Sequence, residues 1–205
     1  MDSGAMIGSL ALEVLRRALG GDAQRKSLQC IVALPQREGG VEDQQWHRDT
    51  PLLFPDFGTT DEPPPSGGDD GAWGGGGPML PPYAVNVFIP LVNITSAMGP
   101  TEFTLGSHAW GSVPPTGSAL TGKPTGQEKD VAFAVPAGTV ILADYRTVHR
   151  GTRNRSDSQR PVAMFIFGRS WWRDAVNYDE GDFGGSAVLS SKPSGKTKQE
   201  TMFWI

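Results

Sequence analysis

Short runs of β-forming residues, separated by turns rich in proline and glycine, limit the folds open to this chain of 205 residues. Glycine occurs 27 times and proline 17 times, and many short strands between such turns are typical of a β-sandwich or a jelly roll. The sequence therefore predicts one mostly β domain. The predicted strands are residues 28–34, 84–91, 101–105, 131–135, 139–143 and 162–167.

Two other segments complete the predicted organisation. Residues 5–19 carry apolar side chains at helical spacing, and Gly20-Gly21 ends that pattern, so we expect a short amphipathic N-terminal helix. We assign residues 1–185 to a single domain and expect a poorly ordered tail over 186–205, although its last four residues are apolar enough to dock.

Residues 55–82 are rich in proline, glycine and aspartate, and cannot bury enough apolar area to order themselves. A loop of this length inside a compact domain is usually either an insertion or a lid. As an insertion it would be solvated, with Trp73 as a stray aromatic residue. As a mobile cover it would bring Trp73 to a substrate.

Charge and cysteine content restrict the classes of partner and compartment. The net charge is −4, and no Lys/Arg cluster indicates nucleic acid, while no apolar run is long enough for a membrane span. The start of the chain is acidic and lacks the basic region of a signal peptide. Cys30 is the only cysteine, which excludes an intramolecular disulfide and favours a reducing, cytoplasmic location. The sequence does not indicate an oligomeric state.

A possible metal site lies around Trp46. In an extended strand Gln45, His47 and Asp49 share one face, because side chains alternate with period two. One imidazole and one carboxylate at this spacing, joined by a distant histidine, form a facial triad that leaves half of the coordination sphere of Fe(II) open. The other histidines are His108 and His149, and His149, which follows a predicted strand, has the better context.

Arg160 begins the predicted strand that follows His149. If the strands that carry them are neighbours, the arginine projects into the cavity that His149 faces. Arginine is suited to holding a carboxylate through two hydrogen bonds. Together with a metal that has open positions, it fits a dicarboxylate that chelates iron at its other end.

These motifs resemble the phytanoyl-CoA dioxygenase-like branch of the Fe(II)/2-oxoglutarate oxygenases, from about residue 44 to residue 168. The order and spacing of the last block make the resemblance specific. The matching residues are Trp46-His47-Arg48-Asp49, Gly99-Pro100, Gly106-Ser107-His108, and His149-Arg150-Gly151-Thr152-Arg153-Asn154-Arg155-Ser156 with Arg160.

The resemblance implies a double-stranded β-helix (a cupin-like jelly roll) with His47, Asp49 and His149 as iron ligands and catalytic residues. It implies that Arg160 pairs with the distal carboxylate of 2-oxoglutarate, and that His108 is a turn residue and not a ligand. The implied enzyme is a dioxygenase, an oxidoreductase that uses Fe(II), 2-oxoglutarate as co-substrate and O₂, with ascorbate as a supporting reductant in vitro.

The same resemblance bears on the substrate. Halogenating relatives have a small residue where this chain has Asp49, so hydroxylation or a related oxidation is implied. Relatives act on acyl-CoA thioesters, small polar metabolites and secondary products. The lack of a Lys/Arg cluster disfavours the phosphates of coenzyme A, and we expect a small organic substrate.

Further candidates rest on position alone. Gln45 shares the face of His47, and Tyr83 and Asn86 lie near the start of the strand after the glycine-rich segment, where they could contact 2-oxoglutarate or substrate. Each of these has an alternative role in packing or in a turn. We expect Trp171-Trp172 to pack at a sheet edge rather than to bind substrate.

Two departures from the family pattern keep other classes open. Met98 stands where relatives usually have Asn or Asp before Gly-Pro, and only 46 residues precede His47, fewer than in typical relatives. A fragment or compact variant could be a metal-binding β-barrel without catalysis that serves as a binding module. A structural β-sandwich with incidental histidines is the third alternative.

Overall fold

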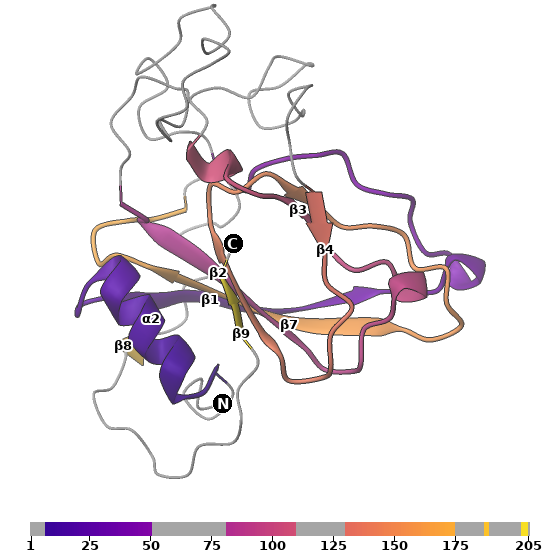
Figure 1. Ribbon diagram of the computed structural model, residues 1–205, viewed down its shortest axis with the longest axis horizontal. Helices are drawn as coiled ribbons and strands as arrows, with labels where there is room; N and C mark the ends of the chain where they lie inside the picture. Colours follow the sequence, from indigo (N-terminus) through magenta and orange to yellow (C-terminus); the bar gives the residue numbers. More distant parts are fainter. Residues whose placement is uncertain (1–6, 51–80, 110–129, 175–186, 189–201, 205) are drawn as a thin grey trace, which may run out of the picture.

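The computed structural model describes residues 7–50, 81–109, 130–174, 187–188 and 202–204. Helix α2 (Ser9–Leu19) comes first, and short 3-10 helices η1 (Gln36–Glu38), η2 (Ser96–Met98) and η3 (Ser107–Ala109) occupy connections (Figure 1). The strands are β1 (Gln24–Ala33), β2 (Ala84–Pro90), β3 (Glu102–Thr104), β4 (Asp130–Ala132), β5 (Val140–Asp144), β6 (His149–Arg150), β7 (Arg160–Gly168), β8 (Ala187–Val188) and β9 (Met202–Trp204).

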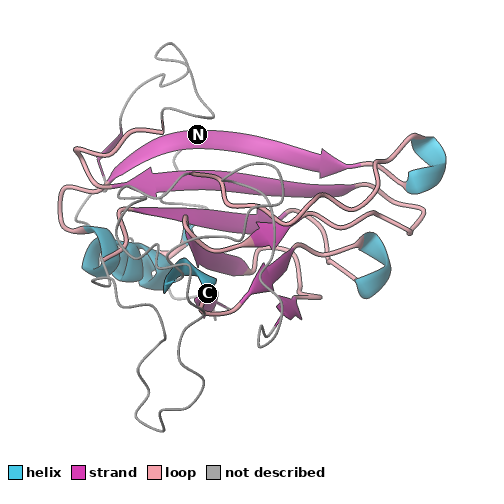
Figure 2. Ribbon diagram, turned by 90° about the horizontal axis from the view of Figure 1, so that it is seen from above, coloured by secondary structure: helices cyan, strands magenta, loops and turns pink. Residues whose placement is uncertain are grey.

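The larger sheet has the strand order β8-β1-β7-β2-β5-β9. Strand β7 lies between β1 and β2 and pairs antiparallel with both, from Ala33↔Arg160 to Gln24↔Gly168 on the β1 side. Strand β5 continues the antiparallel order beside β2, and β9 adds a parallel edge. Figure 2 shows the long strands side by side, with η1 and η2 together at one end of the molecule.

Alternation along the strands divides the apolar side chains between the two faces of this sheet. One face is covered by α2, whose residues Ala11, Leu15 and Leu19 are fully buried against alternate residues of β2, β5 and β7. The other face forms what we call the inner core. Its members include Ala84, Phe88, Ile94, Phe103, Val135, Ile141, Ala143, Tyr145, Met164, Ile166 and Trp172.

A smaller sheet with the order β4-β3-β6 packs on the inner core. Phe103 of β3 meets Phe88 of β2 edge-on, with ring centroids 5.7 Å apart. Two sheets enclosing an apolar interior, with one helix on the outside, confirm the predicted mostly β jelly roll with an N-terminal helix. The predicted strands 84–91, 101–105 and 162–167 match β2, β3 and most of β7, while β1 begins earlier than the predicted 28–34.

One predicted strand is absent, and two connections are resolved by the sheet topology. Residues 45–49 do not form a strand, and only an antiparallel bridge, His47↔His149, links them to β6. Strands β4 and β5 belong to different sheets, so the turn at 136–138 leads from one sheet to the other. The condition under which Arg160 was expected near His149, that their strands are neighbours, is not met, since β6 pairs with β3 whereas β7 pairs with β1 and β2.

The C-terminal segment also differs in part from the expectation of a poorly ordered tail. Ala187–Val188 pairs with β1, and Met202–Trp204 pairs with β5, so the apolar end of the segment does form sheet contacts.

The predicted insertion at 55–82 lies almost wholly outside the described residues, as does Trp73. Within the described part of the chain, no helix has the length and apolar character needed to cross a membrane.

Candidate metal centre

The segment before His47 is held to the chain after His149 by an interrupted ladder. His47 and His149 exchange two backbone hydrogen bonds, of 3.0 and 2.9 Å. One step further, the backbone N–H of Gln44 donates to the carbonyl of Gly151, and the Gln44 side chain accepts from the Gly151 N–H at 2.8 Å. Gln45 is thus an extra residue in the ladder, as in a β-bulge, which explains why no regular strand forms.

This bulge orients the first histidine. The Gln45 carbonyl, which a regular ladder would pair with Gly151, lies 2.8 Å from Nδ1 of His47. Nδ1 of His149 lies 3.0 Å from the carbonyl of Thr147, also two residues earlier. A carbonyl at Nδ1 fixes the ring orientation and leaves Nε2 as the ligand atom, which is the usual arrangement for metal-binding histidines.

The two Nε2 atoms converge on one carboxylate oxygen. Oδ1 of Asp49 is 3.8 Å from Nε2 of His47 and 3.6 Å from Nε2 of His149. Ligand atoms of the three residues all lie within 4.8 Å of one another. Burial and the neighbouring His149 lower the pKa of His47, so its imidazole is neutral and able to bind a metal at neutral pH. Two imidazoles and one carboxylate fit a non-haem Fe(II).

Aromatic rings enclose His149 on the side of the barrel interior. The Phe103 ring stacks on the imidazole at a centroid distance of 5.9 Å, and the Phe88 ring meets it edge-on at 6.5 Å. Arg150, the second residue of β6, forms an ion pair with Glu102 at 2.7 Å, and its guanidinium lies over the Trp46 ring. These contacts hold both flanks of the histidine and limit its movement.

The Gly-Ser-His turn joins the two halves of the centre. The guanidinium of Arg48 donates to the Ser107 carbonyl, and the Ser107 hydroxyl accepts from the backbone N–H of Val148. Ser107 therefore contacts Arg48, which lies between His47 and Asp49, and Val148, which directly precedes His149. His108 is not part of the three-residue group, and its electrostatic neighbours are Asp144, Arg146 and Arg48.

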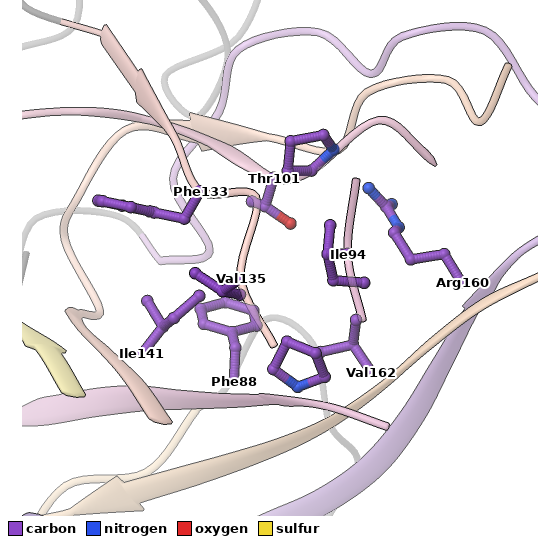
Figure 3. A pocket seen from close by; sticks show the side chains of 10 residues that line it. Phe88, Ile94, Thr101, Phe133, Val135, Ile141, Arg160 and Val162 are labelled. Carbon is purple, nitrogen blue, oxygen red and sulfur yellow. The ribbon is translucent and has the colours of Figure 1, made fainter. Parts of the chain in front are cut away.

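A small pocket lies beside this centre. Figure 3 shows Arg160 entering it from one side, with the hydroxyl oxygen of Thr101 turned inward and apolar side chains around them. Phe88 lines the pocket and also contacts His149, so the pocket adjoins the proposed metal ligands. Its lining is Phe88, Pro90, Ile94, Pro100, Thr101, Phe133, Val135, Ile141, Arg160 and Val162.

Arg160 is only 7% exposed, and burial lowers its pKa. Among the described residues, no acceptor lies within hydrogen-bonding distance of its Nε or Nη1. Buried guanidinium groups are normally paired, because desolvation of a charge is costly. An arginine with two unused donors facing an otherwise largely apolar pocket fits a site for an anionic group such as a carboxylate.

The remaining candidates lie as follows. The Gln45 side chain is exposed, and the residue acts through its carbonyl. Tyr83 packs against Trp172 at 5.8 Å and under Arg146, where burial raises its pKa to about 12. Asn86 donates a hydrogen bond to Asp49 rather than lining the Arg160 pocket. The two tryptophans expected to pack together at a sheet edge differ: Trp172 is buried in the inner core, whereas Trp171 is 62% exposed.

Three residues that shape the candidate site were not predicted from the sequence. The sequence did not single out Thr101 for the pocket, Gln44 for the bulge, or Ser107 as the link between the two ligand segments. Ser107 had a signal in the Gly-Ser-His motif, although the motif alone does not show what the hydroxyl contacts. Gln44 and Thr101 had none, because their roles depend on chain segments far away in sequence.

The family model of phytanoyl-CoA dioxygenase (PhyH) matches residues 8–162. The chain therefore belongs to the phytanoyl-CoA dioxygenase family, as the motifs implied. It is 30% identical over 92 residues to the iron/alpha-ketoglutarate-dependent dioxygenase ausU of Aspergillus calidoustus, a match that covers 43% of this chain and 28% of that protein. The chain thus spans less than a third of that relative.

Solved structures share the fold at low sequence identity. The epimerase SnoN in complex with Fe³⁺, alpha ketoglutarate and nogalamycin RO has a TM-score of 0.58 at 14% identity, covering 93% of this chain and 68% of SnoN. The non-heme monooxygenase ThoJ has a TM-score of 0.57 at 14% identity, covering 97% of this chain and 66% of ThoJ. AviO1 from Streptomyces viridochromogenes Tue57 has a TM-score of 0.51 at 16% identity, covering 79% and 58%.

Proposed function

We propose that this chain is an Fe(II)- and 2-oxoglutarate-dependent dioxygenase that hydroxylates, or otherwise oxidises, a small organic substrate. The observation that carries the proposal is the combination of a His-Asp-His group with a buried arginine in the adjoining pocket, two of whose nitrogens have no acceptor among the described residues. A metal-binding protein without 2-oxoglutarate has no evident need for Arg160 at that position.

Each residue has a defined task in this proposal. Nε2 of His47, Nε2 of His149 and Oδ1 of Asp49 hold iron on one side and leave its other positions open. Arg160 binds the distal carboxylate of 2-oxoglutarate, with Thr101 beside it. Iron with 2-oxoglutarate supplies the oxidising chemistry, in which O₂ is consumed and the co-substrate becomes succinate and CO₂.

The relatives support the same chemistry. The chain shares a family with phytanoyl-CoA dioxygenases, and ausU is an iron/alpha-ketoglutarate-dependent dioxygenase. SnoN, which has a similar fold, binds iron and alpha ketoglutarate. Because SnoN is an epimerase, this fold is compatible with outcomes other than hydroxylation at a substrate carbon.

A second candidate is a metal-binding β-barrel that does not turn over 2-oxoglutarate. The observation in its favour is that the three ligand atoms of the His-Asp-His group could hold a metal ion by themselves, without a co-substrate. In this case the His-Asp-His group would bind a metal, and the Arg160 pocket would bind an anion that is not consumed.

Succinate formation separates the two candidates. Purified protein is incubated aerobically with Fe(II), ascorbate and 2-oxoglutarate, alone and with members of a metabolite library, and succinate is measured. The dioxygenase should release succinate, with more released when a substrate is present. A matched sample loaded with Zn(II) should release none. Metal binding without succinate under every condition would support the non-catalytic module instead.

A further inference from the structure

Asn86 is a buried amide in apolar surroundings. It lies in the middle of β2, opposite Ala143 of β5 and Ile166 of β7, and it is 1% exposed. Its neighbours on the same face of the strand, Ala84 and Phe88, belong to the inner core. Burying an amide here is unfavourable unless its hydrogen bonds are formed, so packing alone does not explain the residue.

The amide contacts the oxygen of Asp49 that does not face the histidines. Nδ2 of Asn86 donates to Oδ2 of Asp49 at 2.7 Å, whereas Oδ1 is the oxygen near both Nε2 atoms. The two carboxylate oxygens therefore have different environments. A rotation of the carboxylate that brought Oδ2 to the metal would break the hydrogen bond to Asn86.

The oxygen of the Asn86 side-chain amide independently indicates a functional role for this residue. Oδ1 of Asn86 is buried, and no donor among the described residues lies within hydrogen-bonding distance. A buried acceptor without a donor costs stability, and such groups commonly mark functional sites or positions of ordered water. Asn86 thus places an energetically costly buried acceptor next to the proposed ligands.

We propose that Asn86 is a positioning residue that keeps Asp49 bound to the metal through one oxygen only. This inference rests on the metal centre of the proposed function. By engaging Oδ2, Asn86 holds Oδ1 toward the two histidines and prevents the carboxylate from using a second coordination position. Outer contacts of this kind commonly change metal affinity, because they fix the orientation of the ligand before the metal binds.

The test is a titration of metal-free protein with Mn(II), followed by the electron paramagnetic resonance signal of free Mn(II). Asn86→Leu has a similar volume but no donor, and should bind Mn(II) about 10- to 100-fold more weakly than the wild type. Asn86→Gln retains a donor on a longer arm and should recover part of the affinity. Asn86→Ala serves the same comparison if Asn86→Leu does not fold.

Thermal unfolding of the metal-free variants separates positioning from general stability. Asn93→Ala is the control, because the Asn93 side chain accepts a hydrogen bond from the Ala137 N–H in a turn. It should leave Mn(II) affinity unchanged even if the melting temperature falls. Asn86→Leu with wild-type Mn(II) affinity would overturn the role given to Asn86. A wild-type protein that binds no Mn(II) would instead contradict the metal centre itself.

Discussion

Replacing Arg160 with glutamine should weaken 2-oxoglutarate binding strongly and leave metal binding intact. Arg160 is 7% exposed at the start of β7, and two of its nitrogens have no acceptor among the described residues. A carboxylate placed against these nitrogens would form two charge-assisted hydrogen bonds in a largely apolar pocket. Glutamine removes the charge and the paired geometry but keeps a side chain of moderate size.

The magnitude follows from the burial. Hydrogen bonds to charged groups contribute about 1.5–3 kcal/mol each. Truncating one partner of a buried, hydrogen-bonded charge pair costs about 2–5 kcal/mol, which corresponds to roughly 30- to several-thousand-fold weaker binding. Arg160→Lys keeps the charge without the two-pronged geometry, so its loss should be smaller than that of Arg160→Gln.

The assay is calorimetric titration of 2-oxoglutarate into the anaerobic Fe(II) protein. A parallel titration uses 2-oxopentanoate, which has the same chain without the distal carboxylate. The wild type should prefer 2-oxoglutarate strongly, and this preference should collapse in Arg160→Gln. Arg155→Ala is the control, because Arg155 is an exposed arginine in the loop that precedes β7 and should leave both affinities unchanged.

Stability supplies a second readout. Burial disfavours the charge of Arg160 in the free protein, so Arg160→Gln should not lower the melting temperature of the metal-free protein. A large fall in melting temperature would indicate a structural role. Near wild-type affinity for 2-oxoglutarate in Arg160→Gln, or a retained preference over 2-oxopentanoate, would refute the assignment of the distal carboxylate to this residue.

Three further predictions concern the metal, the backbone and pH. His108→Ala should retain Mn(II) affinity in the same resonance titration, since His108 lies outside the ligand group, and loss of binding would contradict the ligand assignment. Gly99→Ala should lower the melting temperature more than Gly138→Ala, because both have positive φ but only at Gly99 would a Cβ lie 2.1 Å from a backbone oxygen; equal shifts would refute this. Burial lowers the pKa of His47 and of His108, so the unfolded chain binds more protons than the folded protein when the solution is mildly acidic. The metal-free protein should therefore lose stability as the pH is lowered from about 6.5. Melting temperatures between about pH 8 and pH 5 check this, and a constant melting temperature over that range would contradict it.

The composition of the metal site was predictable because ligand chemistry depends on residue type and spacing. His47 and Asp49 could be picked out from their spacing, and the family resemblance indicated His149 rather than His108 as their partner. The same reasoning predicted a strand for Gln45, where the structure has a bulge. At this bulge the Gln44 side chain accepts the hydrogen bond that a backbone carbonyl would accept in a regular ladder. No local sequence pattern reveals such an exchange of acceptors.

Relationships between distant strands were the least predictable part. The sequence places Arg160 in the pocket only if its strand lies beside that of His149, yet β7 pairs with β1 and β2. The arginine lies near the site because the pocket extends between the two sheets. The hydrogen bond between Asn86 and Asp49 was likewise not predictable, since it depends on where the irregular segment that carries Asp49 lies relative to β2.

The central claim is that His47, Asp49 and His149 hold an Fe(II) that also binds 2-oxoglutarate. The most direct test is the visible metal-to-ligand charge-transfer band after 2-oxoglutarate is added to the anaerobic Fe(II) protein. The account predicts a band in the wild type, and none in His149→Ala or in protein without iron. A wild type without the band, or a band of equal strength in His149→Ala, would contradict it.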